Sequence, residues 1–162
     1  MNLEQLFQDV YPGLHRYCVR MTSDSDVAED AAQEAFVRLL DRRVEGDPAG
    51  LRAWLFKVAT HLIRDRVRIR ENRSRLLEEN PVLPSSPDGP GEALERGERV
   101  ARVREALESL DERDRTLLLL REEGFSYREL ADAVEVKATS VGTLLARARQ
   151  RLANALDGEE TT

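Results

Sequence analysis

The stretch SYRELADAVEVKATSVGTLLARARQRL, residues Ser126–Leu152, decides how the C-terminal part of this chain folds. Ser126 followed three residues later by Glu129 predicts a capping box, so a helix begins there. Apolar residues then recur at the spacing that packs two helices across a short turn: Leu130, Ala131, Val134, Val136, Val141 and Leu144. The pattern favours a helix-turn-helix over a plain helical hairpin. The second helix would present four side chains to a DNA major groove: Thr139, Ser140, Thr143 and Arg147.

The rest of the sequence predicts an all-α protein of two small helical domains joined by a flexible linker. No segment alternates with the period of two that a strand requires. We expect a first domain at residues 1–75, an acidic linker at 76–94 and a second domain at 95–157. Four apolar stripes have helical spacing: Leu3, Leu6, Phe7, Val10, Leu14, Tyr17, Cys18 and Met21; Ala28, Ala31, Ala32, Ala35, Phe36 and Leu39; Leu51, Trp54, Leu55, Val58 and Leu62; and Val100, Val103, Leu107 and Leu110.

Local signals predict where these helices begin and bend. Pro12 followed by glycine predicts a kink in the first helix. Ser23 or Ser25 would cap the second helix, and Asp47 before a proline predicts the start of the third. Asp111 would cap a helix in the second domain.

Composition argues against several classes of protein. Cys18 is the single cysteine, which excludes an internal disulfide and a Cys-rich metal site. Its place on an apolar stripe favours core packing over a nucleophile, and only His15 and His61 remain as catalytic histidines. We therefore expect no enzyme, no catalytic residue, no metal and no cofactor. No signal peptide or membrane span is evident, so a cytoplasmic protein without membrane insertion is expected.

The net charge of −6 conceals two basic segments. Residues 64–75 hold six arginines against Asp65 and Glu71, a local charge of +4, and residues 137–152 hold four cations and no acid. Residues 76–98 carry six carboxylates against one arginine. Two basic segments, one inside a helix-turn-helix, favour nucleic-acid binding, although arginines at helix ends can also simply complement the helix dipole.

Three segments carry a resemblance to the bacterial extracytoplasmic-function sigma factors, which keep sigma regions two and four. They are AEDAAQEAFVRLL (28–40), LRAWLFKVATHLIRDRVR (51–68) and LESLDERDRTLLLLREEGFSYRELADAVEVKATSVGTLLARARQRL (107–152). The resemblance covers nearly the whole chain and its order and spacing are specific. It implies a factor that binds core RNA polymerase, recognises the −35 and −10 promoter elements and aids promoter melting. The alternative is a helix-turn-helix regulator that never joins polymerase.

The resemblance also implies residue roles. The polymerase β′ clamp helices would bind a polar face of Asp30, Gln33, Glu34 and Arg38. The −10 element would contact Arg42, Arg43, Lys57, His61, Arg64, Arg66 and Arg68. The −35 element would contact Arg128, Lys137, Thr139, Ser140, Thr143, Arg147 and Arg149. Further partners implied are the polymerase β flap and an anti-sigma factor. Asp65 would orient neighbouring arginines, and Trp54 fits core packing better than base stacking.

Several positions depart from the patterns named above. His61 stands where asparagine is frequent in the family, and Gly142 and Leu144 replace Lys and Arg. Two positions depart from the usual helix-turn-helix: Glu135 occupies a turn position often taken by glycine, and Lys137 stands where a Ser or Thr cap is more usual. We therefore expect fewer phosphate contacts at the −35 element, and promoter preference does not transfer. The linker acids, Glu78 among them, would mimic a polyanion inside polymerase or simply act as a solubilising tether.

Overall fold

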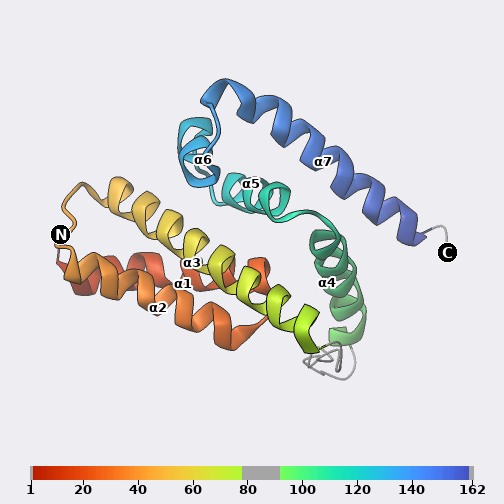
Figure 1. The fold of residues 1–162 in the computed structure, drawn as a ribbon, viewed down its shortest axis with the longest axis horizontal. Helices are drawn as coiled ribbons and strands as arrows, with labels where there is room; N and C mark the ends of the chain where they lie inside the picture. Colours follow the sequence, from red (N-terminus) through yellow and green to blue (C-terminus); the bar gives the residue numbers. More distant parts are fainter. Residues whose placement is uncertain (1, 78–91, 161–162) are drawn as a thin grey trace.

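The computed structural model describes the backbone of residues 2–77 and 92–160. Within those ranges the chain forms seven α-helices and no strand, which confirms the predicted all-α class. Figure 1 shows them in order. They are α1 (Leu3–Thr22), α2 (Ser25–Asp41), α3 (Pro48–Leu77), α4 (Glu92–Ser109), α5 (Glu112–Glu122), α6 (Tyr127–Val134) and α7 (Ala138–Glu160).

The first three helices pack on one another and form the first domain. Small residues make the contact face of α2, and all six of the predicted stripe are buried: Ala28, Ala31, Ala32, Ala35, Phe36 and Leu39. Alanine lets the neighbouring helices approach closely at little cost in side-chain entropy. Helix α1 continues through Pro12 without a break. The predicted start of α3 is confirmed, because Asp47 Oδ1 accepts a hydrogen bond from the N–H of Gly50 at 2.7 Å.

Two predictions in this domain were wrong in detail. Asp24, not Ser23 or Ser25, caps α2 by accepting hydrogen bonds from the N–H groups of Asp26 and Val27. Leu3 and Phe7 belong to the predicted α1 stripe, yet both side chains are 43% exposed. They lie at the N-terminal end of α1, where Phe7 stacks on Tyr11 and meets the edge of Phe36 instead of entering the core.

Helix α3 is buried on more sides than a single stripe predicts. Leu55 and Leu62 are buried as expected, and Phe56, Ala59 and Ile63 are buried as well. The reason is that α3 packs against α1 and α2 and also against α6 of the second domain. Trp54 is half-buried against the core, as expected, and also lines a cavity of about 220 Å³ between α3 and α6.

One polar contact lies at the centre of the first domain. The hydroxyl of Tyr17 lies 2.6 Å from Thr60 Oγ1, and both side chains are fully buried. Thr60 Oγ1 donates its own hydrogen to the carbonyl of Phe56 at 2.7 Å. The Tyr17 hydroxyl is therefore the donor to Thr60, and burial raises the pKa of Tyr17 above its usual value.

The second domain is built from α4 to α7. Asp111 caps α5 as predicted, by accepting from the N–H of Asp114 at 2.8 Å. Val100 and Val103 were expected in the core but are 50% and 44% exposed, so α4 packs mainly through its last turns, where Ala106 and Leu110 are buried.

A single arginine ties the two domains to each other at helix ends. Arg115 Nε and Nη2 donate to the carbonyls of Leu107, Glu108 and Leu110 at the end of α4. Its Nη1 donates to the carbonyl of Met21, in the last turn of α1, at 3.0 Å. A guanidinium satisfies the unpaired carbonyls of both helix ends and opposes their negative dipole.

The helix-turn-helix is formed by α6 and α7. The predicted capping box is present, because Ser126 Oγ accepts from the N–H of Glu129 and the Glu129 carboxylate accepts from the N–H of Ser126. Leu130, Ala131, Val134 and Val141 are buried as predicted. Val136 and Leu144 are half-buried, and Leu145 and Ala148 complete the buried side of α7.

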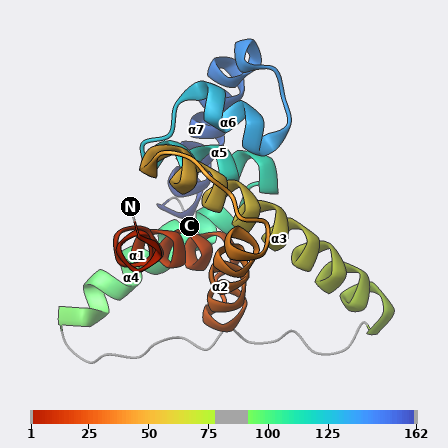
Figure 2. The same ribbon diagram turned by 90° about the vertical axis from the view of Figure 1, so that its left-hand side faces the viewer.

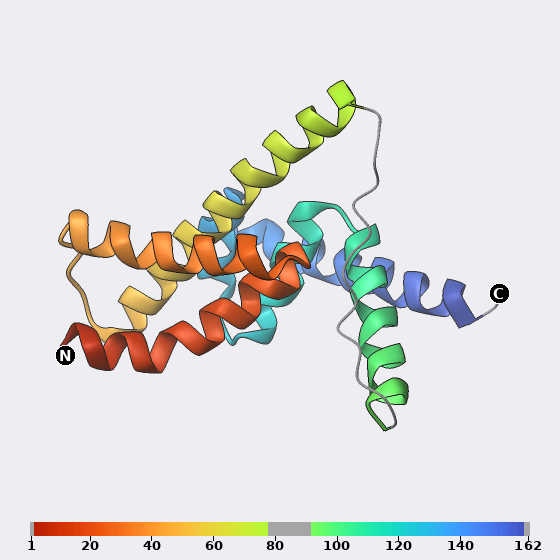
Figure 3. The same cartoon turned by 90° about the horizontal axis from the view of Figure 1, so that it is seen from below.

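The two domains lie against each other, as the views in Figures 2 and 3 show. Helix α5 contacts α1, and α6 contacts α3. The C-terminal part of α3 extends beyond this packed body (Figure 3). Residues 78–91, which carry most of the predicted linker including Glu78, lie outside the described residues, while residues 76–77 still belong to α3 and residues 92–94 already belong to α4.

The turn of the helix-turn-helix gives a stability prediction. Glu135 has φ 59° and ψ 48°, a left-handed conformation that crowds a Cβ atom. Glu135→Gly removes this crowding, which stabilises the folded state, but glycine also raises the conformational entropy of the unfolded chain, which opposes folding. The removal of crowding is the larger effect, so we expect the free energy of unfolding to rise by about 0.5–1 kcal/mol. Urea denaturation measures it. Glu105→Gly, at an exposed position inside α4, is the matched control and should destabilise the chain by about 1 kcal/mol.

Candidate nucleic-acid and polymerase interfaces

The polar face of α2 lies open to solvent on the first domain. Asp30 and Gln33 are exposed, and Glu34 and Arg38 are half-exposed at helical spacing. Glu34 Oε1 accepts from Arg38 Nε at 3.2 Å, and Gln33 donates to Glu29 at 3.2 Å. Asp30 pairs with Arg66 of α3 at 3.3 Å. The structure therefore brings all four predicted polymerase contacts onto one surface, next to the cations of α3.

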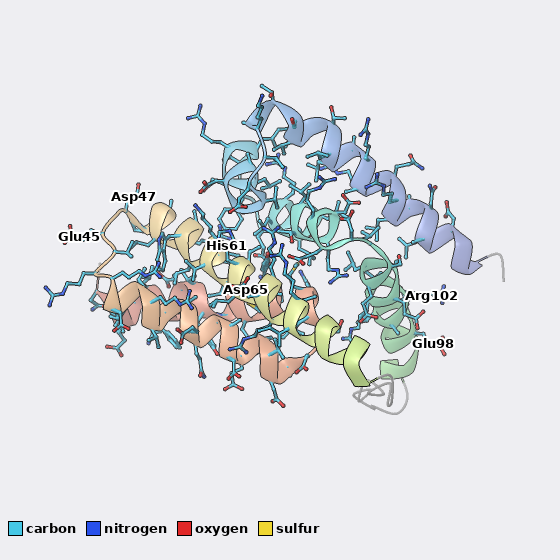
Figure 4. All side chains as sticks on the ribbon, viewed as in Figure 1. Glu45, Asp47, His61, Asp65, Glu98 and Arg102 are labelled. Carbon is cyan, nitrogen blue, oxygen red and sulfur yellow. The ribbon has the colours of Figure 1, made fainter. Side chains whose placement is uncertain are left out.

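The cations of α3 do not form one free surface. Lys57 Nζ lies 2.9 Å from Asp132 of α6, and Arg64 Nε lies 2.7 Å from Glu112 Oε1 of α5. His61 lies on the side of α3 that faces the second domain (Figure 4), with its Nε2 3.3 Å from the carbonyl oxygen of Ala133. These three predicted −10 contacts meet the second domain in this arrangement.

The other predicted −10 residues are accessible. Arg42 and Arg43 are exposed in the turn after α2, where Arg43 adopts a positive φ of 47°. Arg68 is exposed on α3, and Arg66 is half-exposed beside Asp30. Asp65 is exposed, and it forms no ion pair with the described arginines Arg64, Arg66 and Arg68, so its orienting role stays a prediction.

The predicted −35 residues lie on the outer side of the helix-turn-helix. Ser140 is half-buried and the other six are exposed: Arg128, Lys137, Thr139, Thr143, Arg147 and Arg149. Within the described part of the chain, none of the four cations forms an ion pair. Arg151 differs, because its Nη1 lies 2.5 Å from the buried carboxylate of Asp114. That hydrogen bond raises the pKa of Arg151. Because Arg151 is paired, it is not one of the free cations of this basic segment.

The structure explains why position 144 holds a leucine, and it shows space for a side chain at Gly142. Leu144 is half-buried and packs against the core, so this position is not free to contact phosphate. Gly142 is exposed, and a Cβ atom added there would meet only Tyr127 Cε2, at 3.7 Å. A Cβ atom therefore fits at position 142, and the position is open to solvent.

Sequence reasoning missed the groups that join the domains. The guanidinium carbon of Arg52 lies 4.9 Å from the ring centre of Phe56 and 4.3 Å from that of Phe125. Arg52 also donates to the carbonyl of Glu123 at 2.9 Å, and its Nη2 lies 3.6 Å from the Glu123 carboxylate. Glu123 and Phe125 lie about 70 residues from Arg52 in the chain, so no local pattern signals these two contacts.

The described residues offer little for covalent chemistry. They contain no group of three or more His, Cys, Asp or Glu side chains that could hold a metal ion. Cys18 is fully buried. None of the described helices combines the length and the apolar character needed to cross a bilayer.

The fold and the exposed basic helix are those of a two-domain helical DNA-binding protein, and comparisons with known proteins narrow the class. Residues 6–73 match the family Sigma-70 region 2, and residues 101–152 match Sigma-70, region 4. The RNA polymerase sigma-H factor of Pseudomonas aeruginosa is 30% identical over 151 residues, which span 85% of this chain and 77% of that protein. The RNA polymerase sigma factor YlaC of Bacillus subtilis is 26% identical over 93% of this chain and 90% of its own length.

Solved structures show the same fold. The sigma factor RpoE of Bartonella quintana, solved in complex with the anti-sigma factor NepR, superposes with a TM-score of 0.70 at 23% identity, covering 95% of this chain and 96% of that one. CnrH, solved with the cytosolic domain of CnrY, gives a TM-score of 0.68 at 24% identity over 96% and 87% of the two chains. The chain belongs to the sigma-70 family of RNA polymerase sigma factors, in its extracytoplasmic-function class.

The burial of Cys18 gives a prediction about reactivity. Burial raises the pKa of this thiol from its ordinary 9.0 to about 12, so almost no thiolate exists near pH 8. We expect a thiol reagent such as DTNB to react slowly with the native chain and rapidly in denaturant. Because the folded pKa is the higher one, this thiol stabilises the fold fully below pH 9 and loses its contribution as the pH rises toward 12. Equal reaction rates in native and denatured protein would contradict the burial of Cys18.

Proposed function

We propose that this chain directs promoter-specific transcription initiation by bringing core RNA polymerase to a promoter and helping to open it. The observation that carries the proposal is the presence of sigma-70 regions 2 and 4, in order, in one chain. The α2 face of Asp30, Gln33, Glu34 and Arg38 docks on the polymerase clamp helices. The match to region 2 over residues 6–73 disfavours a regulator that only binds DNA.

Each of the two basic surfaces binds a different promoter element. Lys137, in the turn before α7, and the exposed Thr139, Thr143 and Arg147 of α7 read the −35 element as a duplex. The residues before and along α3 hold the −10 element once its strands separate, because melting requires a surface that prefers single-stranded DNA. The domain boundaries follow as first proposed from the sequence, with region 2 at 1–75 and region 4 at 95–157.

The chain supplies binding energy and no covalent step, and it works in the cytoplasm with the polymerase. An anti-sigma factor is a further proposed partner. The support is that RpoE of Bartonella quintana, which has the same fold, was solved with such a partner. Run-off transcription with purified core polymerase and genomic fragments tests the function and yields the promoter sequence. A chain that yields no discrete promoter-dependent transcript would refute it.

The docking face gives a binding prediction. Glu34→Arg replaces the attraction to Arg38 with repulsion and reverses the charge offered to polymerase. We expect retention of the chain on core polymerase to fall more than about tenfold, since reversed charges inside an interface are costly. A pull-down at fixed salt measures it. Asp9→Arg, at an exposed position of α1, is the matched control. Equal loss in both variants would point to net charge and not to this face.

The −35 surface gives a pair of DNA predictions with opposite signs. Arg147→Ala removes one phosphate or base contact, which weakens binding of a promoter duplex and lowers its salt dependence by about one ion. Gly142→Lys adds a cation at a position with room, and should strengthen binding and steepen the salt dependence. Fluorescence anisotropy at several salt concentrations measures both.

Arg102→Ala, at an exposed position of α4 labelled in Figure 4, is the control for the loss of charge. Should Arg102→Ala weaken duplex binding as much as Arg147→Ala does, the assignment of α7 as the DNA-reading helix is wrong.

A further inference from the structure

The basic segment that includes α7 contains one arginine that is not free. Arg151 follows Arg147 by four residues, so both lie on the same face of the helix. The side chain of Arg151 is 50% exposed, and a long exposed guanidinium beside a DNA-reading surface would ordinarily bind a phosphate. Its Nη1 instead donates to Oδ2 of Asp114 in α5 at 2.5 Å. Arg147 and Arg149 form no ion pair with any described residue, so the acceptor in α5 affects Arg151 alone.

Asp114 is an unusual acceptor, because its side chain is only 1% exposed. The first turn of α5 holds it in place, since Asp111 Oδ1 accepts from the N–H of Asp114 at 2.8 Å. Asp114 Oδ1 has no hydrogen-bond partner among the described residues, so Arg151 is the cation that compensates this carboxylate there. Removing the cation from a buried carboxylate leaves an uncompensated charge, which costs far more than opening an ion pair on the surface. Asp114 therefore retains Arg151, whereas a surface carboxylate would release it to DNA.

The packing of α5 on α7 does not require this carboxylate. The two helices contact each other side by side (Figure 1), and Leu117 of α5 and Leu145 of α7 are fully buried. An apolar side chain at position 114 would hold the helices together as well or better, because replacing a buried ion pair with apolar residues of similar size is often neutral or stabilising. The distinctive effect of a carboxylate at this position is on the charge of Arg151.

The pairing changes what α7 offers to a DNA duplex. Each cation that neutralises a phosphate releases about one counterion, which strengthens binding to DNA of any sequence and steepens the salt dependence of that binding. An arginine already neutralised by a carboxylate brings no net charge to such a contact. Phosphate contacts carry no sequence information, so withholding one lowers the affinity for all DNA and leaves the choice of a site to contacts with base edges.

We infer that Asp114 is a positioning residue of the DNA-binding domain, which holds the Arg151 guanidinium against α5 and withholds it from DNA phosphates. Lys137, Arg147 and Arg149 then supply the cations of this surface, one fewer than the sequence offers. The lower sequence-independent affinity reduces the time that the chain spends on the many non-promoter sites of a genome. The inference rests on the proposed function, because it takes α7 as the helix that reads DNA.

The first test removes the carboxylate of Asp114. Asp114→Leu keeps the branching of the side chain and releases Arg151. We expect it to bind a fluorescein-labelled, random-sequence duplex of about 20 base pairs roughly threefold to tenfold more tightly at low salt, with a salt dependence steeper by about one ion. Fluorescence anisotropy at several salt concentrations measures both quantities. The matched control is Glu122→Gln, at an exposed position of the same helix, which makes the same change in net charge and leaves Arg151 paired.

The second test identifies the arginine that is responsible. Arg151→Gln in the unaltered chain should change the salt dependence by less than about half an ion, because the charge of Arg151 is already withheld and the glutamine amide can still donate to Asp114. The same substitution combined with Asp114→Leu should abolish the gain in affinity. Arg147→Gln is the comparison and should lower the salt dependence by about one ion in both backgrounds. A purely structural role of the ion pair would change stability and leave these salt dependences unaltered.

Urea denaturation checks that each variant is folded. Should Asp114→Leu fail to fold, Asp114→Asn removes the charge at the same size and should act in the same direction, with a smaller gain because its amide oxygen still accepts a hydrogen bond. The comparison of Arg151→Gln with Arg147→Gln needs no change at position 114.

Tighter binding and a steeper salt dependence in Asp114→Leu that both disappear with Arg151→Gln support the inference. No gain, a gain that survives Arg151→Gln, a gain equal to that of Glu122→Gln, or a loss of one ion in Arg151→Gln alone overturns it. The proposed function stands in any of those cases if Arg147→Gln loses one ion and run-off transcription yields a specific transcript. An Arg147→Gln variant with unchanged duplex binding would show that α7 does not read DNA, and would reject the inference together with the role proposed for α7.

Discussion

Ion pairs between the cations of α3 and carboxylates of α2, α5 and α6 connect α3 to its neighbours in both domains. A helix that packs apolar residues into a three-helix core cannot move its cations far from one another, and like charges at helical spacing repel. Carboxylates supply the compensation from two sides. Asp30 of α2 meets Arg66, and Glu112 and Asp132 of the second domain meet Arg64 and Lys57. The contact of the second domain with α3 combines two of these ion pairs with the packing of Phe56 on Phe125.

This arrangement answers how an acidic chain can hold a polyanion. A net charge of −6 does not prevent local positive potential, because the acids are placed where they pair with particular cations. Lys137, Arg147 and Arg149 of the helix-turn-helix stay unpaired within the described part of the chain, whereas Arg151 is held by Asp114. Lys137, Arg147 and Arg149 are thus available, whereas Arg64 and Arg66 of the first basic segment are paired.

Much of the local structure could be predicted from short-range chemistry. The capping box at Ser126, the cap at Asp111 and the helix start at Asp47 were predicted correctly, because each depends on residues three or four positions away. The buried alanines of α2 followed from helical spacing alone. The cap at Asp24 was missed because Ser, Asp and Ser stand side by side and any of them can cap a helix.

The sequence by itself determined the helices, most of their caps, the two-domain all-α class and, through the order of its motifs, the family. Only the tertiary structure decided which predicted side chains are accessible. Lys57, His61 and Arg64 look like free cations and donors in the sequence, yet they meet groups about 50 to 75 residues away. Val100 and Phe7 follow apolar stripes but remain exposed. Helical periodicity specifies which residues share a face, whereas what covers that face depends on the packing of segments distant in the chain, and no local pattern encodes that packing.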